Sequence, residues 1–370
     1  MLRISSAGVL RSYRTGLTRS YAQLAAATQT ATDFLAFRNF GTNPAAASKS
    51  FQLIRSYGKT QNYIDNSKAV TKRLSSAWES AMTLSDSADK IDGTIGEAMN
   101  GDQDLASRKL QVSTIRGEME AMVQNLNTKH VDTFVFAGVN AGEAPFTLDD
   151  EYNLYYQGIN VDTGLDKDRN PVDTGLVEIP PQGLENLTDD EKAEFGKKTL
   201  EALANEKVYV DVGLGMKNND GTTGSFASSN DINSASAVNV SMPGIQLIGY
   251  GKDADGNPLN AISQLRNICK ELLQDPIDVD KISDMRNQFH DTCNVIREGI
   301  SQLDTRVGFA KSNQETLTKT SDSLYEQISD LTTVDPAQAY MDLSYAQYYY
   351  NSTLKIGNGI LGQSFIDYMN

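Results

Sequence analysis

The side chains that most often perform catalysis or bind metals are scarce in this sequence and poorly spaced for either task. Histidine occurs only as His130 and His290, and neither belongs to an H-E-x-x-H sequence or to a pair spaced as metal ligands. Cys269 and Cys293 lack C-x-x-C spacing. The glycine motifs of nucleotide-binding loops and the G-x-S-x-G sequence of serine hydrolases do not occur in it. We therefore predict no catalytic residue, no metal site and no cofactor.

Two acidic clusters remain as candidates for a calcium site. Asp149-Asp150-Glu151 and Asp189-Asp190-Glu191 offer carboxylates, but neither belongs to an EF-hand loop. The second cluster also suits the first turn of a helix, because a helix N-terminus attracts negative charge. We interpret both clusters as solvated surface.

The two cysteines are predicted to be buried thiols. Both fall on helical patterns, and Pro276 lies between them. A helical hairpin that turns at Pro276 would leave Cys269 and Cys293 offset by about 15 Å along the helices, at 1.5 Å per residue. That offset is too large for a disulfide.

Long stretches of the chain are free to form helices. The nine prolines leave residues 1–43, 45–144, 277–335 and 337–370 without a helix breaker. Apolar residues recur there at spacings of three and four, which is typical of helices that bury one face. Asn43-Pro44 and Asp335-Pro336 are typical helix starts, with a cap followed by proline. We predict helices at about 5–35, 44–100, 103–129, 259–272, 282–331 and 335–370.

The two terminal helices carry narrow apolar stripes. The stripe of the first helix is Leu10, Tyr13, Leu17, Tyr21, Leu24, Thr28, Ala31 and Leu35, and the last helix has Leu343, Tyr350, Leu354, Leu361 and Phe365. Near-heptad spacing buries one face against another helix, and isolated helices are marginal in water. We therefore predict that both helices order fully only when copies of the chain stack around a common axis. The run Tyr348-Tyr349-Tyr350 points in three directions on a helix, which is typical of a helix surrounded by neighbours.

The middle of the chain differs from its ends in residue pattern and composition. Residues 131–136 alternate as a strand does, and we predict that they form a hairpin with 144–146. Residues 151–255 are rich in Gly, Asn, Asp and Ser, with one helical stretch at 189–204. The predicted fold is mainly α, a long antiparallel helical rod or coiled coil with an inserted β-rich domain. Its predicted domains are terminal polymerisation helices at 1–43 with 335–370, a helical rod domain at 44–150 with 256–334, and an outer β-rich insert at 151–255.

The charge distribution excludes some classes of partner. The net charge is −15, and residues 147–256 hold 20 acidic and 8 basic side chains. Such a balance argues against nucleic-acid binding, which requires a basic face. No apolar run approaches the length of a membrane span or resembles the core of a secretory signal, so the sequence alone favours the cytoplasm.

Several segments resemble the flagellin-like axial proteins of bacterial flagella. Met1-Leu2-Arg3-Ile4-Ser5 is similar to the family's M-R-I-S start, and 41–48 resembles the turn that reads D-D-P-A-G-x-A-I-S in flagellins. Phe134-Val135-Phe136-Ala137-Gly138 and Ala144-Pro145-Phe146 resemble one branch, the hook–filament junction proteins of the FlgL type. The segment 334–368 looks like the family's ending.

The resemblance covers about residues 1–146 and 259–370, and it departs from flagellin itself. The Arg-Ile-x-S-A-x-D-D turn of flagellins is absent at 38–45, and the chain ends Asp-Tyr-Met-Asn. These departures favour the junction-protein branch.

This resemblance implies a structural, non-enzymatic role at the hook–filament junction outside the cell. It implies export through the flagellar secretion apparatus without a cleaved signal peptide. The implied partners are a hook-side junction protein of the FlgK type, flagellin, further copies of the chain in a ring, and a cytoplasmic export chaperone bound to the last helix. The implied interface residues are Leu10, Leu17, Tyr21 and Leu24 in the first helix and Leu343, Tyr350, Leu354, Leu361 and Phe365 in the last.

Two other functions stay open at this point. The chain could be a divergent flagellin that forms the filament itself, in which case it would be far more abundant than a ring component. Alternatively, the 151–255 insert could house an enzyme or binding module, although no pairing of a nucleophile with a base supports it.

The narrow stripes of the terminal helices lead to a first prediction. In dilute monomeric solution, limited proteolysis followed by mass spectrometry should cut first within residues 1–40 and 335–370, because their apolar faces lack partners. Protection of both termini in a verified monomer would contradict assembly-coupled ordering.

Overall fold

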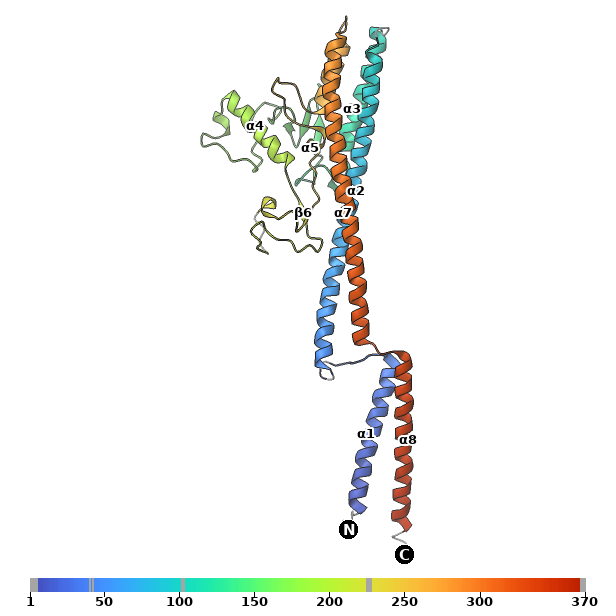
Figure 1. Ribbon diagram of the computed structural model, residues 1–370. Coiled ribbons are helices and arrows are strands. Elements are labelled where there is room, and N and C mark those ends of the chain that lie inside the picture. The colour runs from blue at the N-terminus through green and yellow to red at the C-terminus, as the bar shows by residue number, and fades with distance from the viewer. Residues whose placement is uncertain (1–5, 40, 42, 101–103, 224–227, 367–370) are drawn as a thin grey trace. The chain divides into compact units, whose positions relative to one another are not determined.

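The computed structural model describes residues 6–39, 41, 43–100, 104–223 and 228–366, and side chains between residues 8 and 359 of these ranges (Figure 1). The chain is mostly helical, which confirms the predicted class. The helices are α1 (Ser6–Asp33), α2 (Pro44–Ala98), α3 (Leu105–Leu126), α4 (Asp189–Ala204), α5 (Gly244–Ile248), α6 (Ala261–Leu272), α7 (Val279–Thr332) and α8 (Pro336–Ile366). The predicted long helices are thus confirmed to within a few residues at most ends.

Polar side chains cap the starts of these helices. The Asn43 side chain accepts a hydrogen bond from the backbone N–H of Ala46 at 3.1 Å, and Asp335 accepts one from Ala337 at 2.8 Å. Thr188 and Glu191 form a capping box at α4, in which each side chain bonds the other residue's backbone N–H. That backbone N–H of Thr188 holds the pKa of Glu191 below its ordinary value. The acidic cluster at 189–191 therefore begins a helix, as predicted.

The chain divides into two compact units, residues 1–61 with 318–370, and residues 62–317. Helices α2 and α7 contribute to both units. In the second unit, α2, α3, α6 and α7 share one hydrophobic core. The buried stripe of α2 keeps spacings of three and four along Val70, Leu74, Ala77, Ala81, Leu84, Ala88, Ile91, Ile95 and Ala98. The long, narrow stripe explains why α2 stays straight and unbroken through this core.

A charged cluster ties α2 to α7 in the second unit. The Arg286 guanidinium donates two hydrogen bonds to Asp92, at 2.7 and 2.8 Å, and this contact holds the pKa of Asp92 below its ordinary value. His290 lies 3.2 Å from the same carboxylate. The other histidine, His130, is bonded to the Ser76 hydroxyl at 3.1 Å. Each histidine thus contacts a side chain of α2, and this contact links α2 to another element.

The predicted hairpin between 131–136 and 144–146 is wrong. Two short strands, β1 (Lys129–His130) and β2 (Thr133–Phe134), pair across a tight turn in which Val131 has a φ of 57°. β3 (Phe146–Leu148) pairs instead with β4 (Leu154–Tyr156), and β4 pairs with β5 (Ile159–Asn160). The apolar residues of 131–136 also alternate across this turn, and for that reason the sequence predicted a single strand there.

Residues 151–255 contain little strand beyond these pairs. β6 (Tyr209–Val210) and β7 (Val238–Asn239) form a two-residue ladder, and α4 is the main regular element. The segment contributes Tyr156, Val161, Leu200, Val240 and Ile245 to the hydrophobic core of the second unit. The sheets are therefore small, and this segment and the helices share one core.

The family-like motifs build this core. Phe136 and Phe146 are each 1% exposed, and the Phe146 ring lies 5.0 Å from that of Tyr156. The Asn127 side chain donates to the carbonyl of Phe146 and accepts from its N–H, at 2.8 and 2.9 Å. These motif residues fasten the end of α3 to the small sheet.

Both cysteines are free and buried, as predicted. Burial raises the pKa of the Cys269 thiol to about 11 and that of Cys293 to about 12. Both therefore remain neutral thiols near neutral pH, without the thiolate character of a reactive cysteine.

Gly138 provides a test of this core. Its φ is +66°, and a Cβ built there would lie 2.1 Å from Oε2 of Glu206, which accepts the N–H of Val139 at 3.0 Å. We predict that Gly138→Ala lowers the free energy of unfolding by about 1–3 kcal/mol, because an L side chain is strained in this region and displaces Glu206. Urea denaturation followed by circular dichroism measures the change. Gly142→Ala, with open space at its Cβ, is the control, and equal midpoints for the two variants would contradict the prediction.

Candidate assembly surface

Helices α1 and α8 form an antiparallel pair, here called the terminal pair. Tyr13 packs against Gly357, where a built Cβ would lie 2.1 Å from the tyrosine hydroxyl. Farther along, the rings of Tyr21 and Tyr350 lie 6.1 Å apart, and those of Phe34 and Tyr340 lie 5.9 Å apart edge to face. The residue numbers of the contacting pairs thus increase along α1 as they decrease along α8, which shows that the two helices are antiparallel.

The fully buried positions in the seam of the terminal pair are all small side chains, and its large members are half-buried. Its spacings of three and four match a heptad. On α1 the seam consists of Tyr13, Leu17, Ser20, Leu24, Ala27, Ala31 and Phe34, and on α8 of Ala339, Leu343, Ala346, Tyr350, Thr353 and Gly357. Small residues let the two backbones approach, but they bury little apolar area, and burial contributes only about 25 cal/mol per Å². The seam alone therefore stabilises the pair weakly.

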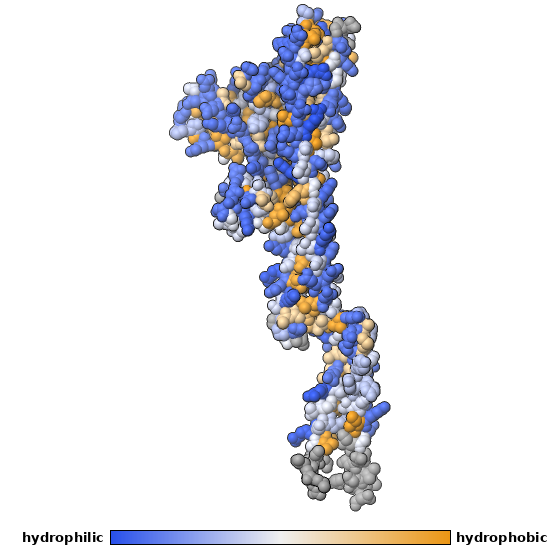
Figure 2. All heavy atoms as spheres, in the orientation of Figure 1, coloured by the Kyte–Doolittle hydropathy of each residue, from blue (hydrophilic) through white to orange (hydrophobic). Residues whose placement is uncertain are grey.

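Many other large apolar side chains of the terminal pair are exposed. On α8, Tyr345 is 63% exposed and Tyr348 is 68% exposed. The other exposed large apolar residues of the pair are Val9, Leu10, Tyr21, Tyr340, Met341, Tyr349, Leu354 and Ile356. Figure 2 shows that the terminal pair carries fewer strongly hydrophilic side chains than the second unit. Exposed aromatic and aliphatic side chains gathered on one helix pair favour a site of protein association.

The predicted interface residues occupy two environments. Leu17, Leu24, Leu343 and Tyr350 are half-buried in the seam, and their neighbours Leu10, Tyr21 and Leu354 are exposed. The side chains of Leu361 and Phe365 lie outside the described residues. The role of all nine in assembly stays a prediction.

Sequence reasoning singled out the run that contains Tyr348 and Tyr349, but it missed Tyr345 and most of the small residues of the seam. Tyr345, Tyr348 and Tyr349 project beside the seam, and Ala346 lies within it. The signal was present in the alternation of alanine and glycine with large residues on α8. A prediction from apolar periodicity misses this alternation, because it assumes that the largest apolar side chains are the buried ones.

The connections beside the terminal pair are held by backbone and charge contacts. The N–H of Ala36 donates to the carbonyl of Thr332 at 2.8 Å, and that of Val334 donates to Phe34 at 2.9 Å. The N–H of Leu35, together with the Arg38 guanidinium, holds the pKa of Asp33 below its ordinary value. The end of α1 and the start of α8 are therefore locked together at one end of the pair.

The part of the chain that the structure describes shows no arrangement for metal binding or membrane crossing. Among the described residues, no group of three or more His, Cys, Asp and Glu side chains is placed to hold a metal ion. Within the same part of the chain, no helix is both long and apolar enough to span a membrane.

The fold is similar to that of a Vibrio parahaemolyticus protein provisionally described as a flagellar hook-associated protein. The TM-score is 0.54 with 12% identical residues, and the match covers 79% of this chain and 100% of the other. Legionella pneumophila flagellar hook-associated protein-3 gives a TM-score of 0.45 at 12% identity, covering 76% and 98% of the two chains. Bacillus cereus FlgL gives 0.42 at 15% identity, covering 75% and 99%. The sequence matches no protein-family model and no curated protein.

The outward surface of the terminal pair can be tested by substitution. We predict that Leu354→Asp combined with Leu361→Asp abolishes self-association of the chain and leaves the main melting transition within about 2 °C of wild type. A carboxylate buried in an assembly interface costs several kcal/mol per copy, whereas Leu354 is already 37% exposed in the free chain. Analytical ultracentrifugation measures association, and circular dichroism measures melting.

The charge-matched control combines Asn351→Asp with Asn358→Asp, two exposed positions on the same helix whose replacement removes no apolar side chain. It should associate as wild type does. A sharp fall in the main melting temperature of the double variant would show instead that these leucines already stabilise the free chain.

Proposed function

We propose that this chain is a structural subunit of the bacterial flagellum, located at the hook–filament junction. The observation that carries the proposal is the terminal pair, in which alanine, serine and glycine occupy the fully buried positions of the seam while several tyrosine, leucine and isoleucine side chains beside it are exposed. A surface so arranged suits a helix pair that is stable only among copies and neighbours packed around a common axis. The fold shared with a protein described as hook-associated supports the same role.

In this role, the terminal pair forms the inner, polymerising part of the subunit. Copies form a ring in which each exposed tyrosine face contacts the next subunit, and adjacent axial proteins cover the two ends of the ring. One side of the ring contacts a hook-side junction protein of the FlgK type, and the other accepts the first layer of flagellin. The acidic segment 147–256 suits a part of the subunit that faces water.

The weak seam also fits export. A terminal pair that is marginal as a monomer stays easily unfolded, which suits passage through a narrow secretion channel before assembly outside the cell. A cytoplasmic chaperone that covers the aromatic face of α8 would keep it from associating early. No catalytic residue or cofactor is needed for any of these steps.

A deletion strain tests the proposed function. We expect cells that lack this gene to keep their hooks, lose filaments and motility, and release unpolymerised flagellin into the medium. Electron microscopy scores hooks and filaments, and immunoblotting of the medium scores flagellin. Expression of the wild-type chain from a plasmid should restore filaments.

Normal filaments in the deletion strain would contradict a junction role. Copy number separates the junction subunit from a divergent flagellin. Quantitative mass spectrometry of purified flagella should find the chain at a small fraction of the filament subunit, as a ring requires, and near-equal amounts would favour the filament alternative.

A further inference from the structure

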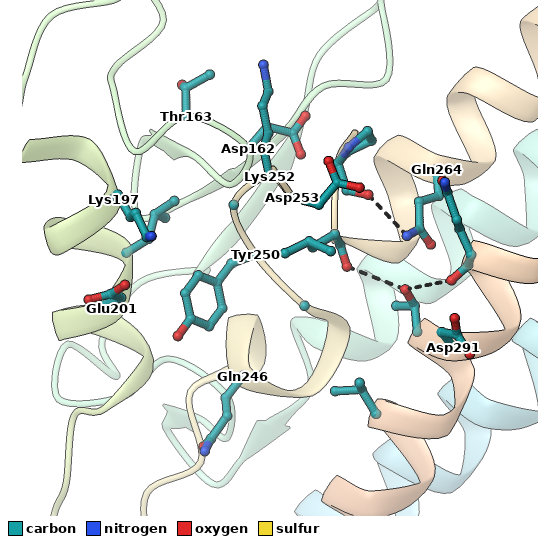
Figure 3. Close-up of a pocket in the computed structure, with 18 of the residues that line it drawn as sticks. Asp162, Thr163, Lys197, Glu201, Gln246, Tyr250, Lys252, Asp253, Gln264 and Asp291 are labelled. Carbon is teal, nitrogen blue, oxygen red and sulfur yellow. Dashed lines mark hydrogen bonds between the residues drawn. The ribbon is translucent and has the colours of Figure 1, made fainter. Parts of the chain in front are cut away.

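A cavity of about 850 Å³ opens in the second unit. Figure 3 shows it between α4, the segment 249–259 and the helices α6 and α7. Its volume falls in the range of small-molecule sites in proteins, about 300–1,000 Å³. The residues that line it belong to one compact unit.

The inner wall of the cavity contains an unpartnered polar atom. Gln264 is only 5% exposed, and its Nε2 donates to the carbonyl of Pro258 at 3.1 Å, which orients the amide. Its Oε1 has no hydrogen-bond partner among the described residues. Buried acceptors are nearly always bonded, and this one is closed off from water by its neighbours, so a ligand O–H or N–H reaches it only when the Gln264 amide shifts.

Apolar side chains line the space beside this oxygen. Leu259 and Val295 line the cavity and are 44% and 43% exposed, so the open cavity leaves them in contact with water. Tyr250 is half-buried, and in Figure 3 its ring projects between α4 and Gln246. A ligand that covers these three side chains needs a flat, weakly polar face.

The charged side chains of the lining select against anions. Four are acidic and two are basic, and the acidic side chains include Glu201 and Asp291, both exposed. Ionised carboxylates only accept hydrogen bonds, so they favour a ligand that presents several hydroxyl groups. The amides of Gln246 and Gln288 can both donate and accept.

We propose that this cavity binds a neutral carbohydrate, with one sugar ring placed against Tyr250, Leu259 and Val295. A sugar ring offers a C–H face for the apolar side chains and hydroxyl groups for the carboxylates and for Oε1 of Gln264. This inference is independent of the proposed flagellar role, since it rests on the second unit alone.

Saturation-transfer-difference NMR on the full chain tests the proposal. The probes are D-glucose, D-galactose, N-acetyl-D-glucosamine, N-acetylneuraminic acid as an anionic sugar, and N-acetyl-trialanine amide as a peptide. We expect at least one neutral sugar to bind with a Kd on the order of 1 mM, and neither the anionic sugar nor the peptide to bind. Gln264→Met keeps the shape and removes the acceptor, and it should weaken binding about tenfold.

The matched control is Gln302→Met, an exposed position on α7 that does not line the cavity, and it should bind as wild type does. Val295→Arg fills the mouth from an exposed helix position and should abolish binding even if Gln264→Met fails to fold. Absence of binding by every neutral sugar, unchanged affinity in Val295→Arg, or binding of only the anionic sugar or the peptide would overturn the proposal.

Discussion

The small side chains in the seam between α1 and α8 set the behaviour of the terminal pair. Alanine, serine and glycine bring the two helices close, and in doing so they leave tyrosines and leucines on the outside. Those side chains can be removed from water only by other molecules. Because hydrophobic burial is the main favourable term in folding, we predict that the terminal pair reaches its full stability only in an assembly.

The second unit has the opposite organisation. Its long helices bury continuous stripes, and α3, α6 and the short strands close around them in one core. The motif residues Phe136 and Phe146 belong to that core rather than to a surface. Their resemblance to a flagellar family therefore reflects packing, since large rings at these places hold the end of α3 against the small sheet.

The two parts of the chain thus suit different tasks. A subunit that must assemble late benefits from ends that are weakly stable alone, and a subunit that must present a defined surface benefits from a rigid remainder. The cavity beside Gln264 lies in the rigid part, where a site can be held open without a ligand. Assembly and ligand binding would thus use different parts of the chain.

The helices and their ends were predictable from the sequence because their causes are local. Asn43-Pro44 and Asp335-Pro336 start helices through contacts within a few residues, and heptad spacing is visible along the chain itself. The burial of Cys269 and Cys293 followed from the same spacing.

Which face of a helix is buried was decided only by the tertiary structure. On α1 the face that contains Tyr21 and Thr28 has the same spacing as the face that contains Ser20 and Ala27. Only the neighbouring helix determines which of the two faces is buried. Two-residue strands such as β1 and β2 also form only where a partner strand is available. The alternation of apolar residues therefore predicted their positions wrongly. The cavity was invisible in the sequence because segments far apart in the chain form its walls. Periodicity records what one segment can bury, whereas contacts between distant segments determine what it does bury.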